Sequence, residues 1–312
     1  MSIAAPHRSP GRLEAALRAG HFVLTAETSP PDAGAAEPVL ARAGCLRGLA
    51  DAVNVTDGAG ARAHMSALAA AALLVQHGIE PVLQFTVRDR NRMALQSDLL
   101  GASALGITNI LCLHGDDPRK GDQPETKPVH DIDSRELMRT ARRMRDEGVF
   151  PSGRAIVPPP HLFIGVADLP TDPKPGWKPD TFRAKVEAGA DFVQTQYCFD
   201  LAVLRRYLAV LGDHGLLERI FIIVGIGPLA SARSARWMND NLFGVHVPEP
   251  LIQRLEQAAD PRAEGRHICV ELLQEMAEIP GVAGAHLRAP RQEAACAEVI
   301  AECGLLARRR AA

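Results

Sequence analysis

Polar side chains recur where apolar segments of this chain end. Glu27 follows the apolar residues 22–24 in the stretch TAETSPP, and Pro30 and Pro31 come directly after it. Seven later apolar segments end on Thr56 and Asp57, Gln84, His114 and Asp116, Asp168, Gln196, Gly225, and His286 with Arg288. A carboxylate can act as a general acid or base, and an amide can donate and accept hydrogen bonds. One such residue would be an ordinary turn cap or solvated charge, whereas the repeated placement predicts a site.

The apolar segments themselves have the character of β-strands. Most lack a clean alternation, as expected for parallel strands covered on both faces. Amphipathic stretches that end near glycine separate them and predict helices, including two or three between residues 231 and 276. Eight strands alternating with helices in 312 residues favour a (β/α)8 TIM barrel over a doubly wound sheet. The predicted strands are residues 22–26, 52–56, 82–86, 109–113, 162–167, 192–196, 220–224 and 284–287.

We assign residues 1–312 to a single barrel domain, with a helical N-terminal extension at 1–20 and a basic tail at 304–312. In such a barrel the strand ends share the C-terminal face, which is where active sites are built. Two polar, proline-containing loops at residues 115–134 and 167–180 would lie on that face. Loops of this length are more often functional than idle. In a barrel, Glu27 and the other strand-end residues would therefore lie close together on one face.

Composition excludes several classes of function. The formal net charge of −2 gives no overall attraction to nucleic acid or anionic membranes. No apolar run approaches a membrane span, and the N-terminus lacks the apolar core of a signal peptide, so we expect a cytoplasmic protein. The six cysteines form no CxxC pair, and the acids of the 115–134 loop are too dispersed to predict a metal site. The sequence contains no heptad repeat of apolar residues that would indicate a coiled-coil oligomer. We keep a homo-oligomer as an alternative.

Five segments carry a family resemblance, and they occur in order along the chain. They are ETSPP after the first strand, VNVTDGAGA on the second, LCLHGDDP on the fourth, KVEAGADFVQTQYCFD on the sixth and IIVGIGPL on the seventh. Together they resemble the strand motifs of methylenetetrahydrofolate reductases, over most of the predicted barrel. The resemblance implies reduction of 5,10-methylenetetrahydrofolate to 5-methyltetrahydrofolate, or the reverse oxidation, with folate as the substrate. A role in methionine supply would require the reaction in the direction of reduction. A role in the catabolism of methyl groups would require the reverse oxidation.

The implied reaction needs an acid at the carbon that accepts the hydride. The one-carbon bridge becomes electrophilic only after a proton on the leaving nitrogen opens the five-membered ring to an iminium. Glu27 matches the family's general acid, and we expect burial under a bound apolar ring to raise its pKa. Asp116 matches a carboxylate near flavin and folate, and Gln196 matches the glutamine that binds the pterin. Gln84, at a position where the family has histidine, is a further substrate-binding candidate.

In the family, FAD relays the hydride from NADH or NADPH to the folate. The matching cofactor positions in this chain are Thr56, Asp57, His114, Leu169 and Lys185. Several depart from the pattern, because His114 replaces an arginine, Asp57 replaces a tyrosine, and Leu169 falls near another tyrosine. The departures concern flavin contacts rather than folate contacts. The chain could therefore hold FAD differently, weakly or not at all, and the nicotinamide would then reduce the folate directly.

Two further hypotheses about the function stay open. One is a folate-dependent methyl-transfer enzyme, which would need a partner that receives or delivers the methyl group. The other is a non-catalytic folate-binding partner subunit with a decayed flavin site. Glu27 argues against this last reading, because binding alone needs no acid at the reacting carbon.

Overall fold

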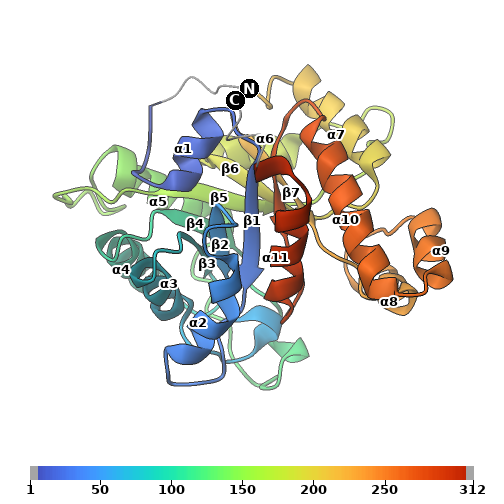
Figure 1. The fold of residues 1–312 in the computed structure, drawn as a ribbon. Coiled ribbons are helices and arrows are strands. Elements are labelled where there is room, and N and C mark those ends of the chain that lie inside the picture. The colour runs from blue at the N-terminus through green and yellow to red at the C-terminus, as the bar shows by residue number, and fades with distance from the viewer. Residues whose placement is uncertain (1–5, 307–312) are drawn as a thin grey trace.

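The computed structural model describes residues 6–306 and contains a closed barrel of eight parallel strands in sequential order (Figure 1). Each strand pairs with the next, and β8 pairs with β1 to close the barrel. The fold predicted from the sequence, a (β/α)8 TIM barrel, is confirmed. The strands are β1 Val23–Thr28, β2 Ala52–Val55, β3 Pro81–Thr86, β4 Asn109–Leu113, β5 Phe163–Asp168, β6 Phe192–Tyr197, β7 Phe221–Ile226 and β8 Val282–Leu287.

All eight predicted strands are present, with boundaries that shift by up to two residues. The shift that matters most is at β1, which runs to Thr28 and so contains Glu27. The expectation that Glu27 follows the strand is therefore wrong by two residues. Backbone hydrogen bonds to β2 and the pleat of the strand hold Glu27 on a rigid element rather than in a loop.

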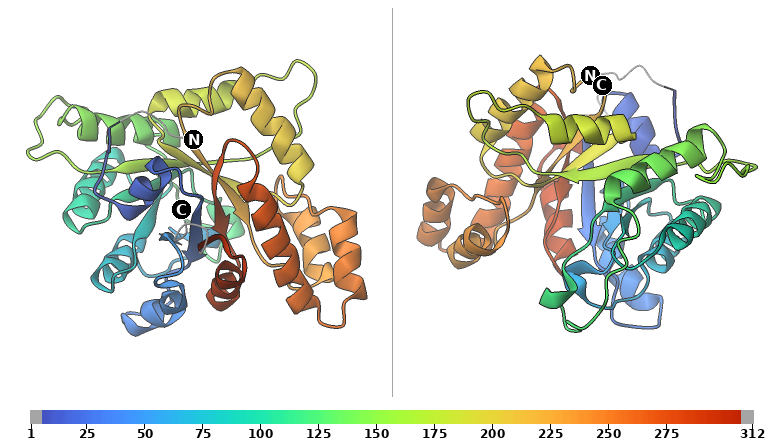
Figure 2. Two further views of the ribbon diagram at one scale, coloured as in Figure 1. Left: turned by 45° about the horizontal axis from the view of Figure 1, so that its top comes forward. Right: turned by 180° about the vertical axis from the view of Figure 1, so that it is seen from behind.

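Helices alternate with the strands and cover the outside of the barrel (Figures 1 and 2). Side-chain caps fix the beginning of five of them, where Asn91, Asp133, Asp200, Ser231 and Asp260 accept hydrogen bonds from the first turn. The helices are α1 Arg12–Arg18, α2 Glu37–Ala43, α3 Ala67–Gln76, α4 Arg92–Ala104, α5 Ser134–Asp146, α6 Asp180–Ala188, α7 Leu201–Asp213, α8 Ala232–Asn241, α9 Glu249–Gln257, α10 Pro261–Ala277 and α11 Glu293–Glu302. Short 3-10 turns lie at η1 Gly44–Leu46, η2 Ala59–Ala61 and η3 Pro118–Lys120.

Helix α1 closes the N-terminal end of the barrel. Its Leu13 and Leu17 pack with the first inward residues of the strands, among them Val23, Phe192 and Phe221. The helical extension proposed for residues 1–20 contains this helix, and residues 1–5 of that extension lie outside the described part. Of the basic tail proposed at 304–312, residues 307–312 lie outside it as well. Because apolar side chains fill the N-terminal end of the barrel, polar side chains can gather only at the C-terminal end.

Between β7 and β8 the chain forms the three helices α8, α9 and α10, as the sequence predicted. Helix α8 packs on α9, and α9 packs on α10, so that α8 and α9 stand outside the ring of helices (Figure 1). Residues 242–248 join α8 to α9, and Phe243 in this connection is 87% exposed. No helix among residues 6–306 is long and apolar enough to cross a membrane.

Candidate active site

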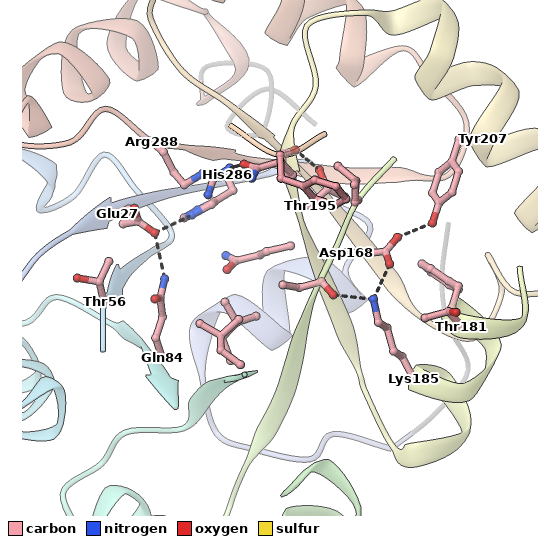
Figure 3. A pocket seen from close by; sticks show the side chains of 18 of the residues that line it. Glu27, Thr56, Gln84, Asp168, Thr181, Lys185, Thr195, Tyr207, His286 and Arg288 are labelled. Carbon is pink, nitrogen blue, oxygen red and sulfur yellow. Dashed lines mark hydrogen bonds and ion pairs between the residues drawn. The ribbon is translucent and has the colours of Figure 1, made fainter. Parts of the chain in front are cut away.

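A cavity of about 640 Å³ opens at the C-terminal end of the barrel (Figure 3). Its walls come from six of the eight strands, all except β2 and β7, from α6 and α7, and from the segments that follow β2, β5, α8 and β8. Six of the residues predicted from the sequence line it: Glu27, Thr56, Gln84, Leu169, Lys185 and Gln196. Strands distant in the sequence therefore bring most of the predicted site together, as the barrel geometry requires.

Glu27 is surrounded by hydrogen-bonding groups. Gln84 Nε2 donates to its carboxylate at 3.0 Å, and His286 Nε2 lies 3.6 Å from the same oxygen. The Glu27 side chain is 20% exposed. Burial raises the pKa of Glu27, but His286, the charge of Arg288 and the Gln84 amide outweigh it and hold the pKa below its ordinary value. In the protein alone, the neighbouring groups therefore lower the pKa of Glu27, and the predicted rise beneath a bound ring stays a prediction.

A buried polar layer lies beneath Glu27 and orients His286. Gln194 Nε2 donates to Thr25 Oγ1 at 3.2 Å and to Asn54 Oδ1 at 3.0 Å, which spans the barrel from β6 to β1 and β2. Thr25 Oγ1 lies 3.0 Å from His286 Nδ1, compared with 3.5 Å from its alternative acceptor, the Ala285 carbonyl oxygen. The ionised Glu27 carboxylate can only accept, so it favours the tautomer in which Nδ1 accepts the Thr25 proton. The other ring nitrogen, Nε2, then carries its hydrogen toward Glu27.

His286 is uncharged in this arrangement. Burial and the neighbouring Arg288 lower the pKa of His286, and the Glu27 carboxylate only partly compensates. At neutral pH the site therefore consists of an ionised Glu27, a neutral His286 and the cation of Arg288. The carboxylate can take up a proton when its surroundings become less polar.

Gln196 lies beside a bulge in β6. The register between β6 and β7 shifts between Gln194 and Tyr197. The bulge presses the backbone of β6 against β7, where a Cβ atom on Gly225 would lie 2.3 Å from the Thr195 carbonyl oxygen. Glycine at position 225 therefore permits the bulge, and the bulge places both Thr195 and Gln196 on the cavity wall.

A second polar group occupies the opposite wall of the cavity (Figure 3). Lys185 Nζ donates to Asp168 Oδ1 at 2.6 Å and to the Ala167 carbonyl oxygen at 2.9 Å. Tyr207 from α7 donates to the other Asp168 oxygen. The Asp168 and Lys185 side chains are only 9% and 17% exposed. The single ammonium on this wall is thus already neutralised by a carboxylate of the protein.

Three predicted site residues do not line the cavity. Asp57 accepts from the backbone N and the hydroxyl of Thr86, at 2.9 and 3.0 Å. Asp116 accepts from the Gly60 backbone N at 2.7 Å, and His114 stacks on His130 with ring centroids 4.3 Å apart. These contacts tie together the loops after β2, β3 and β4. The structure therefore places Asp57, His114 and Asp116 in the loops beside the site rather than on its wall.

Several lining residues have no counterpart among the site predictions. His286 and Arg288 belong to the polar strand ends, and the period of two along β8 could have assigned them to the wall. Trp177, Phe182, Tyr207 and Phe243 come from a loop, from α6, from α7 and from the α8–α9 connection, and no local pattern marks them. Within residues 6–306 no three His, Cys, Asp or Glu side chains are grouped to hold a metal ion.

The sequence matches a family model described as methylenetetrahydrofolate reductase over residues 12–304. Methylenetetrahydrofolate reductase 2 of Schizosaccharomyces pombe is 31% identical over 260 residues, which cover 80% of this chain and 40% of that protein. A probable methylenetetrahydrofolate reductase (NADPH) of Caenorhabditis elegans is 24% identical and covers 76% of this chain. The chain thus spans about 40% or less of the length of these relatives.

Solved structures show the same fold at low identity. An uncharacterized protein from Clostridium thermocellum, described as binding two copies of 5-methyl-5,6,7,8-tetrahydrofolic acid, has a TM-score of 0.62 at 13% identity. That comparison covers 92% of this chain and 97% of the other. EDTA monooxygenase from Chelativorans sp. BNC1 has a TM-score of 0.56 at 10% identity, covering 92% and 94%. The family match over nearly the whole chain, on a barrel with this arrangement of strand-end residues, shows that the protein belongs to the methylenetetrahydrofolate reductase family.

Proposed function

We propose that this protein reduces 5,10-methylenetetrahydrofolate to 5-methyltetrahydrofolate with a hydride from NADH or NADPH. Family membership supports the reaction class. The observation that carries the proposal is the position of Glu27, which lies on a rigid strand inside a cavity and is held by Gln84 and His286. A carboxylic acid so placed can supply the proton that ring opening needs.

The proton and the hydride take separate routes in this reaction. Glu27 gives its proton to the leaving nitrogen of the five-membered ring, and that carbon–nitrogen bond breaks to leave an iminium. The hydride from the nicotinamide then reaches the bridging carbon, which becomes the methyl group, and the nicotinamide leaves oxidised. A proton from water restores Glu27, so the sum consumes one reduced nicotinamide and one proton for each folate.

Ligand binding must change the proton affinity of Glu27 for this step. In the protein alone the pKa of Glu27 is lowered, mainly because His286 and Arg288 offset its burial. A bound pterin and nicotinamide would cover its exposed fifth and remove water from the carboxylate. Desolvation of that kind favours the protonated form. The same site would thus take up the proton on assembling the complex and release it during ring opening.

The family implies a flavin, but the residues of this cavity do not fit one. The matched lysine, Lys185, is bound to Asp168 at 2.6 Å and to the Ala167 carbonyl oxygen. A diphosphate drawn to this ammonium would meet the Asp168 carboxylate first, and like charges at such a distance repel. His114 stacks on His130 outside the cavity wall. We therefore propose direct hydride transfer from the nicotinamide to the folate.

Initial-rate kinetics test the proposal. Direct transfer requires both substrates in the cavity together, so double-reciprocal plots at several folate concentrations should intersect. A relay through a tightly bound carrier would give parallel lines and a reduction by NADH without folate. Protein purified without added flavin should show no flavin absorption and should oxidise NADH or NADPH only with methylenetetrahydrofolate present. Absence of turnover with and without FAD would overturn the proposal in favour of methyl transfer or simple folate binding.

A further inference from the structure

We propose that Arg288 is a positioning residue that determines which hydrogen bonds Gln196 offers to the substrate, with its guanidinium in the wall of the same cavity as the Glu27 carboxylate. The inference deepens the proposed function and rests on it for the identity of the substrate. Arg288 follows β8 directly, while Gln196 lies in β6 and Glu27 in β1, so only the closed barrel brings the three together. Figure 3 shows Arg288 and Glu27 in the cavity wall.

Arg288 itself is held in place by three contacts. Its backbone N donates to the Ile226 carbonyl oxygen at 2.9 Å. The Tyr197 hydroxyl donates to the Arg288 carbonyl oxygen at 3.0 Å, and the guanidinium carbon lies 4.2 Å from the centroid of the Tyr197 ring. A planar guanidinium stacked on an aromatic ring has few other orientations available. Lysine could not reproduce this stacking and the planar fork together.

The Gln196 amide has only one orientation that satisfies its neighbours. Its Oε1 atom accepts from the Tyr197 backbone N at 3.0 Å and from Arg288 Nη2. Both neighbours are donors only, so the oxygen rather than the amide nitrogen must face them. Both lone pairs of Oε1 are then in use, and the two N–H bonds of Gln196 remain for the cavity. A free amide offers both a donor and an acceptor, whereas the acceptor of Gln196 is already occupied within the protein.

A ligand must therefore present a hydrogen-bond acceptor to Gln196. In the proposed substrate the pterin carbonyl oxygen is such a group, whereas its amino group would oppose the Gln196 N–H bonds. The Arg288 Nε atom is buried and has no hydrogen-bond partner among the described residues, so the contact of Arg288 with Gln196 is made through Nη2. The donor pair of Gln196 therefore points to the carbonyl-bearing edge of a heterocycle.

The charge of Arg288 acts on Glu27 as well. Arg288 is the leading charge among the groups that lower the pKa of Glu27, and it also lowers the pKa of His286. Both effects favour the unprotonated forms of Glu27 and His286 in the protein without ligand. Removal of the charge should move the pH dependence of the reaction, whereas loss of the stacked geometry should act on substrate binding. The two roles can therefore be separated by substitution.

The test compares Arg288→Lys with Arg288→Met. Arg288→Lys keeps the charge and loses the planar fork, so KM for methylenetetrahydrofolate should rise about tenfold, the value of one hydrogen bond to a charged donor, with an unchanged pH profile of kcat. Arg288→Met should show the same rise in KM and, in addition, a pH profile displaced to higher pH. Arg205→Met, at an exposed arginine paired with Glu275 on the outer helices, is the matched control and should change neither quantity.

A double-mutant cycle with Gln196→Ala separates positioning from general damage. If Arg288 acts through Gln196, the double variant should bind the folate no more weakly than Gln196→Ala alone. Fully additive losses, or an unchanged pH profile in Arg288→Met, would overturn the inference. The dissociation constant of 5-methyltetrahydrofolate, measured at equilibrium without NADH, reports on the Gln196 contact. This measurement does not require turnover. Failure of the proposed reaction and failure of the Arg288 inference are thus distinguishable.

Discussion

His286 Nε2 lies 3.6 Å from the Glu27 carboxylate, across the seam where β8 pairs with β1 to close the barrel. The contact joins residues 259 positions apart in the sequence (286 − 27). On its other side the imidazole is bound to Thr25, and through Thr25 to the buried amide of Gln194. The acid of the site is therefore tuned by a chain of neutral groups that crosses the barrel beneath it.

Replacement of the acid should remove most of the activity. Glu27→Gln keeps the shape of the side chain but cannot supply a proton, and loss of general acid catalysis typically costs about 10²–10⁴-fold. We expect kcat for folate reduction to fall by that factor while 5-methyltetrahydrofolate still binds. The reduction by wild-type protein should also slow as pH rises, because fewer molecules carry the Glu27 proton. A Glu27→Gln variant as active as the wild type would exclude Glu27 as the acid.

Acidification should destabilise the protein through His286. Burial and Arg288 lower the pKa of folded His286, so below its ordinary value of 6.5 the unfolded chain binds the proton first. The contribution of His286 is therefore intact above about pH 6.5 and is lost as pH falls below it. The free energy of unfolding in urea should be lower at pH 5.5 than at pH 7.5, and His286→Gln should reduce that difference.

A surface histidine provides the control for this measurement. The exposed His77 at the end of α3 has its ring bonded to the Leu73 carbonyl oxygen, so His77→Gln should show the same pH difference as the wild type. An equally large drop in His286→Gln would assign the acid sensitivity to other groups. The lowered pKa of Glu27 adds a loss in the same direction, but only below the ordinary value of 4.5.

The carboxylate on the opposite wall should oppose the binding of a flavin. Asp168→Asn removes the negative charge beside Lys185 and leaves the ammonium available to a phosphate. We expect this variant to bind FAD at least about tenfold more tightly than the wild type, which corresponds to about 1.4 kcal/mol. The dissociation constant of FAD is measured by titration, followed through FAD fluorescence. Asp172→Asn, at an exposed residue of the same loop paired with Arg206, should leave the affinity unchanged. Tight binding of FAD by the wild type would contradict direct transfer.

Packing inside the barrel depends on a glycine opposite an aromatic ring. A Cβ atom at Gly165 would lie 2.3 Å from Cζ of Phe192, which is fully buried and stacks on Phe163. Gly165→Ala should therefore lower the free energy of unfolding by about 1–3 kcal/mol, the usual cost of overpacking a core. Addition of Phe192→Leu should recover part of the loss. The measurement is urea unfolding of the single and double variants.

A second glycine serves as the comparison. At Gly212 in α7 the added methyl would have only an ordinary contact, 3.5 Å from Leu217 Cδ1. Gly212→Ala should stabilise the protein by about 0.4–1 kcal/mol, because alanine restricts the unfolded chain. If both substitutions had the same effect, the packing explanation for Gly165 would be wrong.

The amino-acid sequence alone specifies the barrel and one half of its site. Apolar segments without alternation, helices with polar caps and glycine ends, and the length of the chain leave little choice of fold. The same pattern places Glu27, Gln84 and Gln196 at strand ends, because a strand presents every second residue to the interior. Local information of this kind was sufficient to predict that Glu27, Gln84 and Gln196 line the cavity, but it also placed Asp57, His114 and Asp116 there, which lie in the loops beside it.

The tertiary structure decided what those side chains can do. The ionisation of Glu27 depends on His286 and Arg288, which reach it only through closure of the barrel. The donor character of Gln196 depends on Arg288, and the neutralisation of Lys185 depends on Asp168 and Tyr207. Charge and hydrogen-bond direction are set by neighbours within a few ångströms, and those neighbours come from distant parts of the chain. No local pattern in the sequence carries that information.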